Sequence, residues 1–335
     1  MTGKIALVDE YGAFLSVKDG RFRLLVPENG KKVVKWDLAP VEVDSIVFIV
    51  EGAAISASAI NLASKYGIDL TFLNKNKPIS RLLPAKYGTT MKTWLHQLKT
   101  HQNEKERAKI AKLFVDGKTH NQRMVLMEYS RRLRAAGKHN PKLEKAIKQI
   151  EKYRTKLKQA ETTEEAANIE ALVAREYWKA IATLIPPELE FKERITRSKT
   201  PHKQPDPFNT ALNVGYAILK RETWRATFLA GLNPYLGFLH KPRAGKMALV
   251  YDLMEEFRPI SVDRPIISLA KNKTQTLRKI KLGKEKEAIT EIWKTVINYM
   301  HNAKPPHPTL ITKQARLLAM HLKGTATYKP HKSRW

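Results

Sequence analysis

The chain of 335 residues contains no cysteine. It therefore forms no disulfide, no zinc finger and no other thiolate metal site, and it has no cysteine nucleophile. A chain without disulfides is compatible with a reducing cytosol. This absence excludes the disulfide-stabilised folds and the cysteine-dependent enzymes.

Long apolar runs are missing as well. The N-terminal segment reaches the acidic pair Asp9-Glu10 before any apolar stretch is long enough for a signal peptide. No segment approaches the roughly 20 uninterrupted apolar residues that a membrane helix requires. We therefore expect a soluble, cytoplasmic protein without a membrane partner.

Several common catalytic signatures do not occur either. The sequence has no GxxxxGK[ST] loop and no GxGxxG loop, which argues against an ATPase and against a dinucleotide-dependent enzyme. The GxSxG and HExxH patterns of many hydrolases are absent too. Any catalytic function must therefore come from other combinations of residues.

Acidic residues are scarce relative to basic ones. Lys and Arg number 61 and Asp and Glu number 32, so the formal net charge is +29 at pH 7. This excess is far beyond what solubility needs and predicts a polyanionic partner. Because the positive charge is spread along the whole chain, nucleic acid is favoured over a membrane surface. The hydrophobic fraction of 42% and the six Trp predict that most of the chain folds.

The first 85 residues are typical of short strands separated by turns. Asp19-Gly20 and Asn29-Gly30 have the composition of tight hairpin turns. A helical pattern over Ser56–Tyr66 ends at Gly67. The expected strands are Lys4–Val8, Ala13–Val17, Phe22–Val26, Lys32–Trp36, Ser45–Val50 and Asp69–Leu73. We predict a small β-rich domain over residues 1–85, which is a structural or dimerising module or has a catalytic role.

After Pro84 the pattern changes to long helices, and a chain of this length favours two domains. The first expected helices are Met91–Val115, Asn121–Ala136, Pro141–Gln159 and Thr163–Leu184. We predict an α+β fold, with the small N-terminal β-rich domain followed by a larger all-α C-terminal domain over residues 86–335. Lys192–Pro207 is interpreted as a mobile basic loop that contacts DNA or is a solvated linker. The tail Tyr328–Trp335 is too short and basic to fold alone and is expected to order only on a partner.

Three segments carry the candidate chemistry, and they are Asn168–Trp178, Gly231–His240 and Tyr251–Pro259. On a helix, Glu170 shares a mostly apolar face with Tyr177, where a solvated acid does not normally lie. Asp252 and Glu255 are three residues apart and face the same way. His240 ends an apolar stretch in a loop.

Two or three carboxylates with one imidazole suit Mn²⁺ or Mg²⁺ better than copper or zinc. Such an ion polarises a phosphodiester and stabilises the charge of in-line displacement. Spacing alone leaves other roles open. Glu170 could form an ion pair with Arg175 or Lys179. His240 could be a capped loop histidine, and Asp252 and Glu255 could lie at a helix N-terminus and be stabilised by its dipole.

The same segments resemble the motifs of the CRISPR adaptation integrases, the nuclease-integrases that insert new spacers. The Glu-Gly-x-x-Ala-Arg-x-Tyr motif is matched at Glu170, Ala174, Arg175 and Tyr177, with Ala171 in place of the usual glycine. The Gly-(Leu)-x-Pro-x-(Leu/Ile)-Gly-Phe-(Leu/Val)-His and Asp-Leu-x-Glu-x-(Phe)-Arg-Pro motifs are matched in the other two segments. Further matches are Asp206–Leu219, the Lys-x-x-Asn-Gln helix start within Gly117–Gln122, and Gly52–Ser56.

The resemblance implies an N-terminal β domain that forms a homodimer and an α-helical domain that holds the metal. By motif, the Mn²⁺ or Mg²⁺ ligands map onto Glu170, His240 and Glu255, with Asp252 as an auxiliary acid. Glu256 is expected to be a solvated neighbour or to pair with a basic residue. In this family two dimers flank a dimer of a small ferredoxin-like partner protein and hold a double-stranded prespacer DNA, whose 3′-hydroxyl ends attack the CRISPR repeat.

The basic residues close to these motifs are either phosphate contacts or solvated charges. They are Arg175, Lys220, Arg221, Arg243, Lys246 and Arg258. The implied function is that of a metal-dependent DNA endonuclease and integrase that inserts prespacer DNA into a CRISPR array. The alternatives are a transposon-borne integrase of the same family and a catalytically inactive DNA-binding scaffold.

Overall fold

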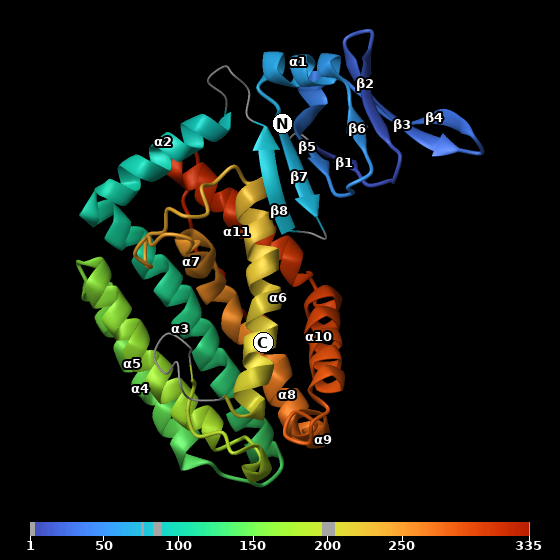
Figure 1. Ribbon diagram of the computed structural model, residues 1–335. Helices are drawn as coiled ribbons and strands as arrows, with labels where there is room; N and C mark the ends of the chain where they lie inside the picture. Colours follow the sequence, from blue (N-terminus) through green and yellow to red (C-terminus); the bar gives the residue numbers. More distant parts are fainter. Residues whose placement is uncertain (1–3, 75–76, 83–88, 196–204, 335) are drawn as a thin grey trace.

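The computed structural model describes residues 4–74, 77–82, 89–195 and 205–334 (Figure 1). A strand-rich part, drawn in blue and cyan, is followed by a larger part made of helices. The predicted α+β fold, small and β-rich first and α-helical afterwards, is confirmed. The predicted domain boundary at residue 85 lies outside the described residues.

Two four-stranded sheets form the N-terminal part. In the first, β1 (Lys4–Val8), β5 (Val43–Phe48) and β7 (Asp69–Asn74) run parallel, and β8 (Lys77–Leu82) is antiparallel to β7. In the second, β2 (Phe14–Lys18), β3 (Arg21–Glu28) and β4 (Lys31–Leu38) form an antiparallel meander, and β6 (Ala54–Ile55) pairs in parallel with β2. Phe22, Leu24 and Val26 are buried, whereas the residues between them are partly exposed, so β3 has one covered face.

Both predicted hairpin turns are confirmed. Asp19-Gly20 joins β2 to β3 and Asn29-Gly30 joins β3 to β4, with φ values of 52° and 71° in the first turn and 50° and 74° in the second. Positive φ at both central positions is what a type I′ turn requires, and its twist matches that of the flanking strands. The predicted helix is also present as α1 (Ala57–Tyr66), which Ser56 caps and Gly67 ends. Strand β8 was not expected from the sequence.

The C-terminal part is helical, as predicted. Its helices are α2 (Thr89–Gln102), α3 (Glu104–Ala135), α4 (Pro141–Gln159), α5 (Thr163–Ala182), α6 (Pro207–Leu229), α7 (Ala248–Phe257), α8 (Arg264–Asn272), α9 (Thr274–Arg278), α10 (Glu285–Asn302) and α11 (His307–Leu322). A π-helical segment, η3 (Arg258–Asp263), links α7 to α8. Among the described residues, no helix has both the length and the apolar character that crossing a bilayer requires.

The predicted division between the first long helices is wrong in two places. The expected helix Met91–Val115 is interrupted at Asn103, whose side chain caps α3 by accepting a backbone hydrogen bond at 3.2 Å. The expected helix start near Gly117 does not exist, because α3 runs through this position without a break. A glycine is needed there for another reason. A Cβ would lie 2.9 Å from Cγ of Glu256 and 3.0 Å from Cβ of Pro330.

Helix α3 lies at the centre of the helical part (Figure 1). It packs against α4 and α5 and also against α7, and α6 packs against α7, α10 and α11. Buried side chains such as Phe114, Tyr177, Phe208 and Phe257 join these helices in one continuous core. This packing brings α3, α5 and α7 together, although they are far apart in the sequence.

The C-terminal tail differs from its prediction. It lies against helices of its own chain and needs no partner to become ordered. Tyr328 is 1% exposed and Ser333 is 6% exposed. The backbone carbonyl of Lys329 accepts a hydrogen bond from Gln314 of α11 at 3.0 Å. The tail is ordered because buried polar groups of the helices satisfy its backbone.

The predicted basic loop Lys192–Pro207 falls largely on residues 196–204, which are outside the described part. Of its described residues, Arg194 donates hydrogen bonds to Oδ1 of Asn209 at 2.7 Å and to Oδ1 of Asn213 at 2.6 Å. Both asparagines belong to α6. The start of this segment is therefore bound to the helical core.

The two parts meet where β8 approaches α6. The guanidinium group of Arg81 donates to the backbone carbonyl of Phe228, lies 4.3 Å from the centre of its ring, and is 3.7 Å from the carboxylate of Asp69. Thr90 of α2 donates to the same carboxylate. Because Arg81 is buried and joined to both parts, this contact fixes the strand-rich part on the helices.

Candidate active site

Side chains from three helices meet at one ammonium group. Lys118 lies on α3, and only 11% of its side chain is exposed. Its Nζ donates a hydrogen bond to Oε1 of Glu170 on α5 and lies 2.5 Å from Oε2 of Glu255 on α7. The structure thus brings together two of the acids that the sequence nominated as metal ligands.

Arg258 completes what we call the charged cluster, which consists of Lys118, Glu170, Glu255 and Arg258. The Nε of Arg258 lies 3.0 Å from Oε1 of Glu255. Burial alone raises the pKa of Glu255, but Arg258 and Lys118 outweigh it and lower this pKa to about 2. Burial lowers the pKa of Lys118, and the two acids more than reverse that effect. At neutral pH, therefore, Glu255 is a carboxylate and Lys118 is an ammonium ion.

Asp252 holds His240 beside the cluster. Asp252 is fully buried, and its Oδ1 lies 2.7 Å from Nδ1 and 2.9 Å from the backbone N of His240. Its Oδ2 accepts the backbone N–H groups of Phe238 at 2.5 Å and Leu239 at 3.0 Å. A proton on Nδ1 satisfies the carboxylate and leaves the lone pair of Nε2 available as an acceptor.

This geometry changes the role expected of Asp252. Four N–H groups already bind its two oxygens, so we assign it to the positioning of His240 rather than to direct contact with a metal. The loop must approach this acid closely, since a Cβ at Gly237 would lie 2.8 Å from Oδ2 of Asp252. The alternative role of Asp252 and Glu255 at a helix N-terminus is wrong, because both lie beyond the first turn of α7.

Helix α2 fixes the other end of the loop that carries His240. The side chain of Gln97 is fully buried and donates to the carbonyls of Asn233 at 2.9 Å and Leu236 at 2.7 Å. Its Oε1 accepts the backbone N–H of Asn233 at 2.9 Å. Nδ1 of His101 lies 2.6 Å from the carbonyl oxygen of Gly237. His240 is thus held by α2 through the loop backbone and by α7 through Asp252.

Glu256 points away from the cluster, into the body of the protein. It is fully buried, and its carboxylate accepts hydrogen bonds from Tyr328, from Nε2 of Gln314 at 2.9 Å and from the backbone N–H of His331 at 2.7 Å. Burial raises its pKa to about 7 in spite of these bonds. The expectation of a solvated acid or a partner of a basic residue is wrong. Consecutive helical positions are about 100° apart, so α7 presents Glu255 to the cluster and Glu256 to the tail.

Asn121 of α3 completes the attachment of the tail. Its Nδ2 donates to the backbone carbonyls of Glu256 at 2.7 Å and His331 at 2.9 Å. Its Oδ1 accepts the N–H of Ser333 at 2.9 Å and the hydroxyl of Ser333 at 2.8 Å. The tail therefore ties α3 to α7 next to the positions that carry the charged cluster.

The donors at this site suit a hard divalent cation. Two carboxylates and one imidazole nitrogen are ligands that Mn²⁺ and Mg²⁺ accept. Oε2 of Glu255 is buried and receives no hydrogen bond of good geometry, although Nζ of Lys118 is 2.5 Å away. Within the described part of the chain, no three His, Asp or Glu side chains surround a common point closely enough to hold a metal. The ammonium group of Lys118 contacts both acids, so an ion between them must displace it.

Two of the predicted phosphate contacts lie next to His240. Lys220 and Lys246 place their ammonium groups 5.3 and 5.5 Å from the ring centre of Tyr251. That ring lies 6.0 Å from the imidazole of His240. Arg243 is exposed in the loop between His240 and α7. Lys220 and Lys246 therefore place positive charge around the ring that lies beside the imidazole.

The other predicted phosphate contacts have different surroundings. Arg258 is engaged with Glu255 inside the charged cluster. The Nε of Arg221 lies 3.9 Å from Oε1 of Glu222, within α6. Arg175 is exposed on α5. Of these residues, Arg175 is the one whose exposure leaves it open to a DNA backbone.

Sequence reasoning missed Lys118. The ion pair that it considered for Glu170 used Arg175 or Lys179, whereas the structure pairs Glu170 with Lys118. One signal was available in the sequence. Lys118 lies one helical turn after Phe114 and one turn before Gln122, which are both buried, and a lysine on a buried face is rarely left unpaired.

Comparisons with known proteins agree with these motifs. Residues 6–291 match the family described as CRISPR associated protein Cas1. The chain is 37% identical over 331 residues to the CRISPR-associated endonuclease Cas1 1 of Saccharolobus solfataricus. The alignment covers 99% of this chain and 84% of that protein. A casposase bound to an integration product has the same fold, with a TM-score of 0.80, 23% identity and coverage of 99% of this chain and 100% of that one. A chain of a partial Cas6-RT-Cas1–Cas2 complex aligns with a TM-score of 0.69, 17% identity and coverage of 100% of both chains. Because the family match spans residues 6–291 and the relative from Saccharolobus solfataricus covers 99% of the sequence, the chain belongs to the Cas1 family.

Proposed function

We propose that this chain is a metal-dependent DNA endonuclease and integrase. The observation that carries the proposal is the meeting of Glu170 and Glu255 at one buried cation, with His240 held beside them. A bound Mn²⁺ or Mg²⁺ would polarise a phosphodiester and stabilise the charge that develops as its bond to oxygen breaks. The names of the relatives support this activity, since one is an endonuclease and another structure contains an integration product.

The side chains of the site have separate tasks in this proposal. Glu170, Glu255 and Nε2 of His240 hold the ion. Asp252 fixes the tautomer and orientation of the imidazole through the 2.7 Å contact at Nδ1. Lys118, once displaced from between the acids, supplies a positive charge that neutralises phosphate oxygens of the DNA.

We propose that the substrate is a prespacer DNA duplex whose 3′-hydroxyl ends attack the CRISPR repeat. The net charge of +29 supports binding through the phosphate backbone, which carries no sequence information directly. Lys220 and Lys246 lie beside His240, and Arg175 and Arg243 are exposed. These four residues are the proposed phosphate contacts.

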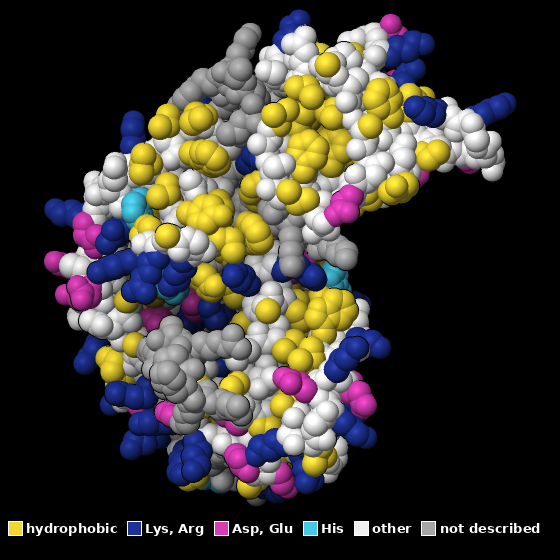
Figure 2. All heavy atoms as spheres, viewed as in Figure 1, with side chains coloured by type: hydrophobic (Ala, Val, Ile, Leu, Met, Phe, Trp, Pro, Cys, Tyr) yellow, Lys and Arg dark blue, Asp and Glu magenta, His cyan; other side chains and the backbone are white. Residues whose placement is uncertain are grey.

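The proposed protein partners are a second copy of the chain and a small ferredoxin-like protein. Figure 2 shows apolar side chains gathered over the strand-rich part. Exposed apolar residues there include Leu7 at 46%, Val41 at 83%, Tyr66 at 52% and Ile79 at 61%. Clustered apolar surface is typical of a protein interface, which supports the homodimer. The name of the Cas1–Cas2 complex supports the second partner.

A CRISPR function is favoured over a transposon-borne one. The relative that is 37% identical over 99% of the chain is named as CRISPR-associated. The casposase is 23% identical, and its similarity shows only the shared fold. The third alternative, an inactive scaffold, is disfavoured because Asp252 holds the imidazole of His240 in place beside the two acids.

Joining of a 3′-hydroxyl DNA end to a repeat-containing duplex in Mn²⁺ tests the proposal. Glu170→Ala and His240→Ala should each reduce joining by roughly a hundredfold or more, because the ion supplies several kcal/mol of charge stabilisation. Glu164→Ala is the matched control, since Glu164 is an exposed acid of the same helix. All three variants should bind duplex DNA like the parent protein, with an affinity that falls steeply as salt rises. Equal joining by Glu170→Ala and Glu164→Ala would refute the assignment.

The role of Lys118 can be measured without activity. Calorimetry or manganese EPR should show tighter Mn²⁺ binding by Lys118→Met than by the parent protein, because the ion no longer competes with the ammonium group for Glu170 and Glu255. Lys112→Met is the matched control, since Lys112 donates to the carbonyl of Ala160 elsewhere on α3. Unchanged or weaker binding by Lys118→Met would contradict competition between the ammonium group and the ion.

A further inference from the structure

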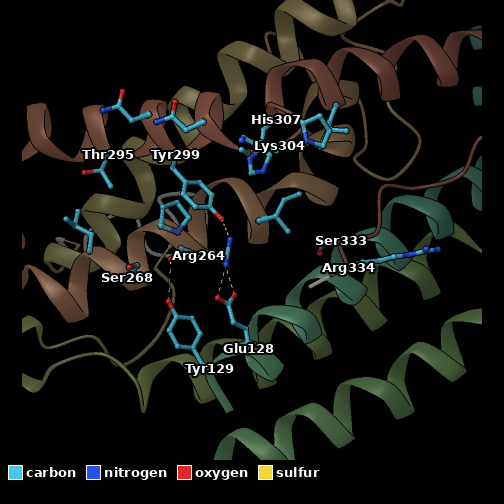
Figure 3. Close-up of a pocket in the computed structure, with 18 of the residues that line it drawn as sticks. Glu128, Tyr129, Arg264, Ser268, Thr295, Tyr299, Lys304, His307, Ser333 and Arg334 are labelled. Carbon is cyan, nitrogen blue, oxygen red and sulfur yellow. Dashed lines mark hydrogen bonds and ion pairs between the residues drawn. The ribbon is translucent and has the colours of Figure 1, made fainter. Parts of the chain in front are cut away.

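A cavity of about 950 Å³ opens in the helical part, away from the charged cluster (Figure 3). Its walls come from α3, η3, α8, α10, α11 with the segment before it, and the C-terminal tail. Glu170, His240 and Glu255 are not among the residues that line it. On α3 its lining begins at Glu128, ten residues after Lys118, which corresponds to about 15 Å along the helix.

The lining is rich in positive charge. Its basic side chains are Arg132, Arg264, Lys273, Lys304, Lys332 and Arg334. The one acid among the lining residues, Glu128, is already engaged. Its oxygens lie 2.7 and 2.8 Å from Nε and Nη2 of Arg264 and 2.5 Å from Nη2 of Arg132. Lys332 is also engaged, because its Nζ lies 2.5 Å from Oδ2 of Asp116 outside the cavity. Lys273, Lys304 and Arg334 are exposed, and they give the cavity its excess of positive charge.

Aromatic rings stand among these cations. Figure 3 shows Tyr129 and Tyr299 on either side of Arg264. Tyr129 is only 3% exposed, and the cationic groups of Lys271 and Arg132 lie 5.2 and 5.7 Å from its ring centre, so its ring is part of the wall behind the cavity. Tyr299 is partly exposed, with the guanidinium group of Arg264 5.7 Å from its ring centre. Ring faces and guanidinium planes are the surfaces on which unpaired bases stack.

Neutral hydrogen-bonding groups complete the wall. Ser268 on α8, Asn298 on α10 and Thr295, one turn earlier on α10, all line the cavity. Amide and hydroxyl groups of this kind bind the edges of bases. The positive field of the cavity is evident at His307. Burial, together with the charges of His331 and Arg264, lowers its pKa to about 4.

We propose that this cavity binds a nucleotide of single-stranded DNA, with phosphate at the cations and the base against the partly exposed ring of Tyr299. A nucleotide is favoured over an acidic peptide because a peptide would use the cations but would have no use for the combination of ring faces and amides. A single strand is favoured over a duplex because paired bases are stacked inside the helix and cannot enter a cavity. The size is that of a site for a small molecule or a short segment. The inference does not depend on the metal chemistry proposed above.

The test uses the full chain and a fluorescein-labelled short oligothymidylate at fixed physiological salt. Asn298→Trp fills the cavity from an exposed position on α10 without a change of charge, and Ser268→Phe fills it from α8. Lys304→Ala removes one lining cation. The matched control is Lys148→Ala, an exposed lysine of α4 outside the cavity. We expect the three cavity variants to bind the oligothymidylate about tenfold more weakly or worse, with duplex binding and Lys148→Ala little changed.

Competition with thymidine monophosphate distinguishes a free nucleotide from a nucleotide within a DNA strand as the ligand of the cavity. Competition by the monophosphate shows that a free nucleotide also fits, whereas competition by the oligonucleotide alone shows that a strand is required, and both results support the proposal. Unchanged oligothymidylate binding by folded Asn298→Trp and Ser268→Phe would overturn it. Equal losses in Lys304→Ala and Lys148→Ala would overturn it too, because general electrostatic attraction would then explain the binding. A cavity variant that no longer binds an oligoglutamate peptide but still binds the oligothymidylate would show that the cavity is a site for an acidic peptide instead. Mn²⁺ binding should be unaffected in all of these variants, so failure here is distinct from failure of the proposed activity.

Discussion

The two faces of α7 carry the same kind of side chain in different surroundings. Glu255 faces Lys118 and Arg258, and Glu256 faces Tyr328 and Gln314. Burial raises the pKa of both acids, but the cations bring that of Glu255 down to about 2, whereas that of Glu256 reaches about 7. The difference teaches that the partners of a carboxylate, and not its depth of burial, decide whether it is held in the ionised form.

Helix α3 serves both faces as well. Lys118 reaches the acids of the charged cluster, and Asn121 binds the tail and the backbone of Glu256. One helix therefore contacts both the site face and the tail face of α7. The variants below separate the site face of α7 from its tail face.

The largest effect is expected on the site face. Glu255→Ala should reduce DNA joining by roughly a hundredfold or more, because it removes a proposed ligand of the ion. The tail contacts of Glu256 are left intact, so the tail face should stay ordered, which hydrogen exchange of the segment after Tyr328 can check. A strand-transfer assay in Mn²⁺ measures the joining. If Glu255→Ala joins DNA as well as the parent protein does, the two faces of α7 do not differ in the way described above.

Glu256→Gln is expected to act on folding rather than on chemistry. Three donors point at this carboxylate, so an amide would direct one N–H group at another donor and lose at least one charged hydrogen bond. We expect a loss of about 2 to 3 kcal/mol in the free energy of unfolding, measured by urea denaturation. Glu164→Gln is the exposed control on α5. Stability equal to that of the parent protein would show that the tail contact is dispensable.

A pH dependence is expected near the tail. The lowered pKa of His307, about 4 against 6.5, means that the folded state binds this proton less readily than the unfolded chain. Its contribution to stability is complete above pH 6.5 and is lost as the pH falls toward 4, by roughly 2 kcal/mol between pH 7 and 5. Glu256, whose pKa is raised, gives the opposite slope over this range, so the difference between the parent protein and His307→Gln isolates the histidine. Identical slopes in urea denaturation would contradict this account.

The smallest effect is expected from Tyr328→Phe. This change removes the hydroxyl that donates to Glu256 but keeps the ring, which packs 5.7 Å from that of Phe114. Two donors to the carboxylate remain. We expect a loss of about 1 kcal/mol, seen as a modest drop in the unfolding midpoint. A loss as large as that of Glu256→Gln would mean that the hydroxyl carries the whole contact.

Local patterns predicted the strand-rich part well and the start of the helical part less well. The turns Asp19-Gly20 and Asn29-Gly30 were predictable because their residues tolerate positive φ. The break at Asn103 and the unbroken helix at Gly117 were not, because a cap within a helical pattern and a glycine without space for a side chain depend on neighbours. The tail was misjudged for the same reason, since its partners lie on α3, α7 and α11.

The sequence by itself determined the absence of thiol chemistry, the large excess of positive charge, the order of strands before helices, and the family motifs that nominate Glu170, His240 and Glu255. These properties depend on composition or on residues close together in the chain. Only the tertiary structure decided that Lys118 stands between two acids, that Asp252 serves His240, and that Glu256 belongs to the tail. Helical spacing places Glu255 and Glu256 almost equally near the face of Asp252. Which of the two acids lies next to a cation depends on side chains of helices that are distant in the sequence. A spacing rule within one helix contains no information about those helices.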